Sequence, residues 1–184
     1  SRPAWRRAGD YWNASAVMVG TVTAARPQWT DDVLPDYHRS TLALGPDPDG
    51  EGDLFATVVR RAGQSASSRV VLAVHGFTDY FFNTELADHV AGSGHRLYGV
   101  DLHKCGRSWR PGQTPHFTTD LSRYDRDLEL ALALITAENP GAEVIVYGHS
   151  TGGLVVALWL DRVRRRAATA ALGLTGLVLN SPFL

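Results

Sequence analysis

The segment 144–160 constrains this chain more than any other part of its sequence. A short apolar run is followed at 148–152 by the turn G-H-S-T-G and then by an amphipathic helical pattern. A serine held between a buried strand and a helix projects beyond the edge of the sheet, where a substrate can reach it. Gly148 and Gly152 suit a tight turn with other parts of the chain close by. We therefore predict that Ser150 is an exposed nucleophile.

Two backbone N–H groups are predicted to lie beside this serine. The helix begins directly after it, so the N–H of Thr151 lies at the positive end of the helix dipole and is free to bind a developing negative charge. A second apolar run, 70–74, is followed by His75, Gly76 and Phe77. In a parallel sheet this loop ends beside the serine and supplies a second donor, which we assign to the Phe77 N–H. Thr151 and Phe77 are thus predicted to form an oxyanion hole.

Strands and helices alternate through most of the chain, which predicts an α/β fold with a mostly parallel sheet covered on both faces. An antiparallel hairpin is expected to precede it, because a turn-rich stretch separates the first two strands. The expected strands are 37–44, 54–59, 70–74, 97–100, 144–147 and 177–179. The expected helices lie around 86–90, from near Asp120 to Asn139, and through 154–166. Residues 1–36 are an N-terminal extension without an assigned role, and 37–184 form one domain.

Composition excludes several classes of function. A net charge of −1 gives no indication of nucleic acid or an anionic membrane as a partner. No apolar run reaches the roughly 18 residues of a membrane helix. Cys105 is the only cysteine, so neither an internal disulfide nor a cysteine metal site is possible, and a cytoplasmic location is expected. No metal or cofactor is predicted, since the glycine-rich turn lacks the Lys-Ser/Thr pair of a phosphate loop.

Three motifs occur in a characteristic order: H-G-F at 75–77, D-x-x-x-x-G-x-S at 101–108 and G-H-S-x-G-G at 148–153. This set resembles the α/β-hydrolases of the monoacylglycerol lipase and lysophospholipase group. The resemblance implies the α/β-hydrolase fold, an acyl-enzyme on Ser150 and a lipid-like monoester as the substrate. It also implies that Asp101 braces loops and is not the acid of a catalytic triad. Where that family usually has Gly-His, this chain has Lys104 and Cys105.

A serine nucleophile needs a histidine base and an acid, which in this fold follow the serine in the order acid, then histidine. None of the seven histidines follows Ser150, and the only acid after it is Asp161, in the middle of a helix. His149 should point away from the turn. His75 is either the base or a buried histidine bonded to its own loop, and we favour the second. We therefore expect the chain to be the N-terminal part of a longer hydrolase, ending after a sixth strand, with acid and histidine beyond Leu184.

Other interpretations remain open. The chain could be an inactive, hydrolase-like binding protein or a truncation product, and amide cleavage or perhydrolysis could replace ester hydrolysis. Relatives with an aspartate nucleophile are disfavoured because the turn carries serine. Ser181 is a second candidate serine, but it lacks flanking glycines and is expected to be an ordinary residue at a strand end. Cys105 could have a lowered pKa beside Lys104 and Arg107, although a small buried residue is the preferred interpretation. The sequence gives no oligomeric state.

Overall fold

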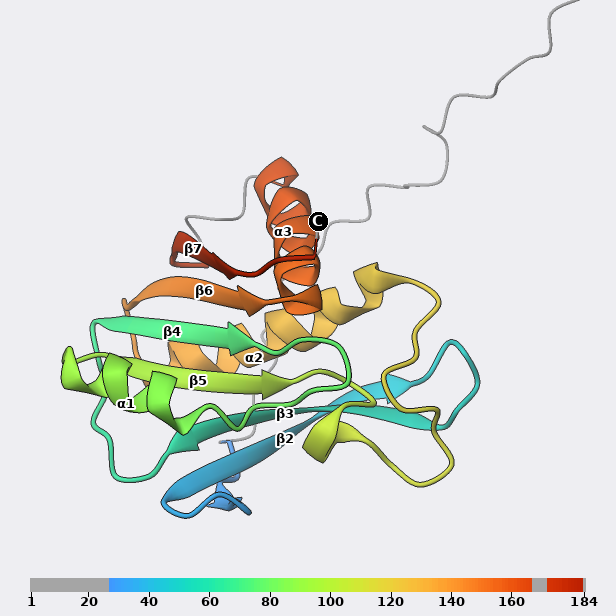
Figure 1. The fold of residues 1–184 in the computed structure, drawn as a ribbon, viewed down its shortest axis with the longest axis horizontal. Coiled ribbons are helices and arrows are strands. Elements are labelled where there is room, and N and C mark those ends of the chain that lie inside the picture. The colour runs from blue at the N-terminus through green and yellow to red at the C-terminus, as the bar shows by residue number, and fades with distance from the viewer. Residues whose placement is uncertain (1–26, 167–171, 184) are drawn as a thin grey trace, which may run out of the picture.

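The computed structural model describes residues 27–166 and 172–183, and its centre is a mixed sheet of seven strands (Figure 1). The strands lie in the order β1-β2-β3-β5-β4-β6-β7. They are β1 (Thr30–Asp31), β2 (Tyr37–Pro46), β3 (Asp53–Arg61), β4 (Arg69–Val74), β5 (Arg96–Asp101), β6 (Glu143–His149) and β7 (Leu174–Asn180). β2 and β3 form an antiparallel hairpin, whereas β5, β4, β6 and β7 run parallel to one another.

Helices cover both faces of this sheet. The described residues form α1 (Thr84–Gly92), α2 (Tyr124–Glu138) and α3 (Thr151–Arg165), together with 3-10 turns at Gly106–Ser108 and Leu121–Arg123. α1 lies on one face, and α2 and α3 lie on the other (Figure 1). Leu72 packs in the core beneath α2 and α3, while its neighbour Ala73 packs in the core beneath α1. None of the helices in the described ranges has the length and apolar character needed to cross a membrane.

The parallel strands end at one edge of the sheet, and the arrowheads of β4, β5 and β6 point the same way in Figure 1. The strand register pairs Val74 of β4 with Gly148 of β6, and His149 of β6 with Asn180 of β7. The loops that follow β4 and β7 therefore meet on either side of the turn at 148–152.

The predicted α/β architecture, its hairpin and its six strands are confirmed. The sheet also contains β1, which the sequence did not indicate because two polar residues show no hydrophobic alternation. Thr30 of β1 pairs with Arg39 of β2, so part of the predicted extension 1–36 belongs to the sheet. Residues 1–26 lie outside the described residues.

The long predicted helix begins later than expected. The Asp120 carboxylate accepts a hydrogen bond from the Ser122 N–H at 2.8 Å and so caps the 3-10 turn that precedes α2. α2 itself starts at Tyr124 and ends directly before Asn139. Asp120 is thus a cap, as its residue type suggested, but of the short turn and not of the α-helix.

Candidate active site

Ser150 stands at the junction of β6 and α3 in a strained backbone conformation, with φ 51° and ψ −121°. Positive φ is uncommon for residues other than glycine and persists only where the surroundings impose it. Both backbone groups of Ser150 are engaged. Its N–H donates to Asn180 O at 3.0 Å, while its carbonyl accepts from the N–H groups of Gly153 and Phe183 at 2.9 and 3.0 Å. β7 and the residues after it therefore hold the serine in place.

The glycines of the turn are required by close approaches of other chain segments. A Cβ at Gly148 would lie 2.7 Å from Val156 Cγ2 and 2.8 Å from Gly153 Cα. A Cβ at Gly152 would lie only 2.3 Å from the carbonyl oxygen of His75. Real Cβ atoms do not come this close to backbone atoms, so the turn, β4 and α3 could not pack together with larger residues there.

The loop after β4 lies directly against the serine. A Cβ added to Gly76 would be 3.2 Å from Ser150 Cβ, so any larger residue there would crowd the serine. Phe77 and Thr151, the two residues assigned to the oxyanion hole, line the same small cavity of about 20 Å³. A cavity of that size holds about one water molecule. Its other lining residues are His75, Gly76, Leu102, Cys105, His116, Tyr124, Gly152 and Val155.

His75 is a buried residue whose two ring nitrogens both bind backbone groups. Nε2 accepts a hydrogen bond from the Leu102 N–H at 3.1 Å, so Nδ1 carries the hydrogen and donates to Gly76 O at 2.8 Å. Protonation of Nε2 would break the bond to Leu102. This geometry ties the loop after β4 to the end of β5, and it leaves no ring nitrogen free to receive the proton of a serine.

His149 and Tyr147 alternate with the buried residues of β6 and lie on the face that carries α1. Both line a cavity of about 160 Å³ together with Asn180, which donates to Tyr147 Oη at 2.7 Å. The Nδ1 atom of His149 is buried and has no hydrogen-bond partner among the described residues. The small cavity beside Thr151 is lined by Tyr124 of α2 and Val155 of α3, which pack on the opposite face of the sheet.

Two further side chains considered from the sequence lie apart from this chemistry. Asp161 is on the outer side of α3, where it pairs with Arg164 and Arg165 at 3.2 and 2.7 Å. Ser181 is an exposed residue directly after β7, and its hydroxyl donates to Asn180 Oδ1 at 3.3 Å.

Asp101 joins two loops, as predicted. Its Oδ1 accepts from the Phe81 N–H at 2.8 Å, and its Oδ2 accepts from both the N–H and the guanidinium of Arg107 at 2.9 Å. The same guanidinium binds Asp32 at 2.6 Å. Both carboxylates and the guanidinium are buried, so this cluster holds the loops after β4 and β5 together.

The hypothesis of a reactive Cys105 is wrong. The thiol is buried, and burial raises its pKa well above the usual range. The Lys104 ammonium, which was expected to stabilise a thiolate, instead binds Asp47 and Glu51 at 2.6 and 2.7 Å. Arg107 is engaged with Asp101. Neither cation is therefore available to the sulfur.

A buried histidine–aspartate pair was not foreseen. Both carboxylate oxygens of Asp127, on α2, lie within 2.9 Å of His103 Nδ1, and the side chains are 2% and 0% exposed. Burial raises the pKa of Asp127 even though the neighbouring His103 acts in the opposite direction. The pair has the composition of a base and its orienting acid, but no solvent or substrate reaches it. It fixes the end of β5 to α2.

His116 is the residue near the site that sequence reasoning missed. It lies in the irregular segment before α2 with φ 60°, and it lines the small cavity with Phe77 and Thr151. Its ring packs edge-on against the Phe77 ring, with centroids 5.9 Å apart. Burial, together with the neighbouring His75, lowers the pKa of His116. No local motif marks this position, because a lone histidine in a turn-rich segment has no diagnostic spacing.

The described residues contain no group of three or more His, Cys, Asp or Glu side chains placed to hold a metal ion.

Comparison with known proteins agrees with this geometry. The sequence profile of the family described as serine aminopeptidase, S33, matches residues 65–184. Methylesterase 8 of Arabidopsis thaliana is 34% identical over 70 residues, which cover 38% of this chain and 24% of the relative. The chain therefore spans about a quarter of that relative.

Solved structures share the fold at low sequence identity. Esterase Est22 superposes with a TM-score of 0.57 at 14% identity, covering 82% of this chain and 46% of that protein. A probable hydrolytic enzyme from Pseudomonas aeruginosa PAO1 superposes with a TM-score of 0.54 at 22% identity, covering 78% and 41%. The chain thus spans less than half the length of these two structures, and at such identities the likeness concerns the fold alone.

Proposed function

The chain belongs to the serine aminopeptidase S33 family and has the α/β-hydrolase fold, and from that premise we propose that it hydrolyses carboxylic esters through an acyl-enzyme on Ser150. The observation that carries this proposal is the strained backbone of Ser150 between β6 and α3, with Gly76 directly against it. Strain of this kind persists at functional sites, because the surrounding packing has to maintain it.

In the proposed reaction Ser150 Oγ attacks the ester carbonyl carbon, and the bond to the alcohol breaks as the tetrahedral intermediate collapses. The negative oxygen of that intermediate accepts hydrogen bonds from the N–H groups of Thr151 and Phe77. Removing one such donor typically costs about 3 kcal/mol of transition-state stabilisation. Thr151 also lies at the N-terminus of α3, where the helix dipole favours negative charge. Water then hydrolyses the acyl-enzyme.

The reaction needs a base that takes the serine proton and then gives it to the leaving alcohol. His75 is already committed to two backbone groups, and His103 is buried against Asp127. In α/β-hydrolases the acid and the histidine come after the serine in the chain. We propose that both follow Leu184, and that Gly148, His149, Gly152, His75 and Gly76 support the turn and the loop around the nucleophile.

A lipid-like monoester, of the monoacylglycerol or lysophospholipid type, is the narrower form of the proposal. The order of the three sequence motifs supports it. Exposed aromatic side chains around the carboxyl edge of the sheet also suit an acyl chain; they are Phe77, Tyr80, Phe82, Trp109 and Phe117. The cytoplasm is the proposed compartment, since the buried thiol of Cys105 is free.

Cleavage of a peptide bond is the second candidate, because the matching family is described as a serine aminopeptidase. The same nucleophile and oxyanion hole would serve either bond. Hydrolysis of p-nitrophenyl esters and of amino-acid p-nitroanilides by the whole protein, beside its Ser150→Ala variant, tests both.

We expect ester hydrolysis that Ser150→Ala abolishes. Faster, Ser150-dependent release of p-nitroaniline would favour the peptidase, and a folded protein inactive on both substrate classes would favour a binding protein.

A further inference from the structure

The turn between β2 and β3, residues 47–52, binds the ammonium group of a buried lysine. The Lys104 ammonium lies 2.6 Å from Asp47 Oδ2 and 2.7 Å from Glu51 Oε2, and its side chain is 1% exposed. Burial alone would lower the pKa of Lys104, but its hydrogen bonds to the two carboxylates raise the pKa above the usual value. The lysine therefore stays charged while buried.

Lys104 occupies this place in spite of its backbone conformation. Its φ is 60°, in the left-handed region that favours glycine. The strain is compatible with folding because the side chain gains two charge-assisted hydrogen bonds. Lys104 thereby links the loop after β5 to the β2–β3 turn.

The same turn also holds the segment 109–120, which lies beside it in Figure 1. Glu51 accepts from the N–H and the hydroxyl of Thr114 at 3.0 and 2.7 Å. Asp49 accepts from the hydroxyl of Thr119 at 2.8 Å and pairs with Arg123. Three carboxylates of one turn therefore bind four side chains from Lys104 to the start of α2.

The contacts continue from this segment to the candidate active site. The His116 N–H donates to Lys104 O at 3.0 Å, and the His116 ring packs edge-on against Phe77. Phe77 carries one of the two proposed oxyanion donors. An unbroken series of contacts therefore runs from Glu51 through Lys104 and His116 to the oxyanion loop.

We propose that Lys104, held by Asp47 and Glu51, is a positioning residue that fixes His116 as the wall of the small cavity beside the oxyanion donors. His116 is then a specificity-determining residue. The cavity is small, about 20 Å³, so a branch at the α-carbon on this side of the ester carbonyl would meet the His116 ring. The substrates are therefore esters with an unbranched α-carbon. This substrate class rests on the proposed ester hydrolysis, whereas the link through Lys104 does not.

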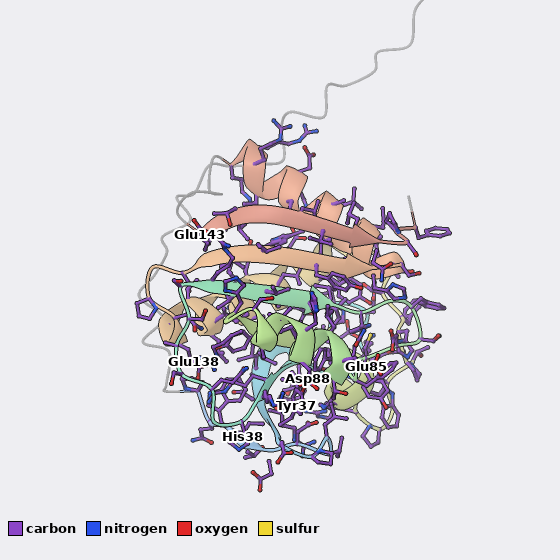
Figure 2. The ribbon with its side chains drawn as sticks, turned by 60° about the vertical axis from the view of Figure 1, so that its left-hand side comes forward. Tyr37, His38, Glu85, Asp88, Glu138 and Glu143 are labelled. Atoms are coloured by element: carbon purple, nitrogen blue, oxygen red, sulfur yellow. The ribbon has the colours of Figure 1, made fainter. Side chains whose placement is uncertain are left out.

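The link is tested by hydrogen exchange of the whole protein and two matched variants. Glu51→Gln removes one carboxylate from the Lys104 ammonium. Glu143→Gln is the control: it breaks the exposed pair with Arg69 at the amino-terminal end of β6, where Figure 2 labels Glu143. We expect amides of 109–120 to exchange about tenfold faster in Glu51→Gln, the size expected for a lost charge-assisted hydrogen bond, and not in the control. Equal exchange in all three proteins would overturn the link.

Lys104→Gly is a second variant, which relieves the backbone strain and removes the ammonium group from Asp47 and Glu51. Folding is checked by circular dichroism, and kcat/KM is measured on p-nitrophenyl acetate and on the α-branched p-nitrophenyl isobutyrate. Both Lys104→Gly and Glu51→Gln should raise the isobutyrate-to-acetate ratio about fivefold, within the range that one methyl group is worth in a pocket.

An unchanged ratio in folded, active variants with faster exchange at 109–120 would overturn the role in specificity. If the wild-type protein hydrolyses neither ester, the proposed function fails, while hydrogen exchange of Lys104→Gly still decides whether Lys104 holds the segment, because Glu51→Gln also alters the direct contact with Thr114.

Discussion

Two neighbouring segments at the edge where the parallel strands end are held in place by different physical interactions. The turn at 148–153 is fixed by close packing and by backbone hydrogen bonds. Its glycines stand where a Cβ atom would lie within 3 Å of other chain segments. The segment 104–120 is fixed by charges, because the carboxylates of the β2–β3 turn bind Lys104, Thr114, Thr119 and Arg123. Packing does not depend on pH or salt, whereas these ionic contacts do. The position of Ser150 should therefore stay the same when the pH or the salt concentration changes, whereas the position of His116 beside it should change.

The largest effect is expected from Gly152→Ala, which tests the packing of the turn. Its Cβ would meet the backbone oxygens of His75 and Val74 at 2.3 and 2.7 Å, and no flexible side chain can yield there. We expect the free energy of unfolding, measured with urea, to fall by about 3 kcal/mol. Gly176→Ala on β7 is the control, because its nearest neighbour would be Ile145 Cγ1 at 3.4 Å, and it should change stability by less than about 1 kcal/mol. Equal losses in the two variants would contradict the comparison.

Asp101→Asn tests the cluster that holds the loops after β4 and β5 together. Asp101 is fully buried and accepts hydrogen bonds from Phe81 and Arg107. Removing its charge leaves a buried guanidinium with one carboxylate in place of two, so we expect a loss of about 2 kcal/mol in urea denaturation. The exposed Asp161→Asn serves as its counterpart and should leave the unfolding curve where it is. A wild-type curve for Asp101→Asn would show that the loops do not depend on this cluster.

Lowering the pH should loosen the segment 104–120 before it affects the turn. The hydrogen bond from Arg123 holds the pKa of Asp49 at about 2. For Asp47, burial opposes the hydrogen bond from Lys104, and the net pKa is below the usual value. A carboxylate whose pKa is lowered by folding stabilises fully above its unfolded pKa, about 4, and that contribution is lost as the pH falls through the folded value.

Hydrogen exchange at pH 5 and pH 3 checks this expectation. Protection of the Thr114 and Thr119 amides should fall between the two conditions, while that of the Ser150 and Gly153 amides persists. Simultaneous loss of protection at all four amides would mean that the two parts are not independently held.

The smallest effect is expected at Cys105. Because burial raises the pKa of this thiol, it should react with Ellman's reagent at pH 8 at least about 100-fold more slowly than free cysteine. A fast reaction of the folded protein would restore the thiol hypothesis that the structure overturned.

The same contrast explains what could be predicted from the sequence. The turn around Ser150 was predictable because its strand, glycines and helix are contiguous, and each has a local physical cause. The hairpin and parallel strands followed from apolar runs of the right length. β1 was not predictable, since Thr30 and Asp31 pair with β2 without any hydrophobic pattern.

The position of His116 beside the cavity could not be predicted from local sequence patterns. Lys104 binds Glu51 across 53 positions of the chain, and the segment of His116 is fixed through that contact. Only Lys104, where the resembled family usually has glycine, marked the place. The sequence favoured a small buried residue at Cys105, which is confirmed, but it did not indicate the contact between Lys104 and Glu51. Long-range ionic contacts leave no local periodicity, so they become visible only in three dimensions.

Fluorophosphonate labelling of the whole protein, followed by intact mass and peptide mapping, tests the central claim most directly. We expect one adduct per chain, located on Ser150, and none in a folded Ser150→Ala variant. An adduct that persists in that variant, or that maps to Ser181, would contradict the assignment of Ser150 as the nucleophile.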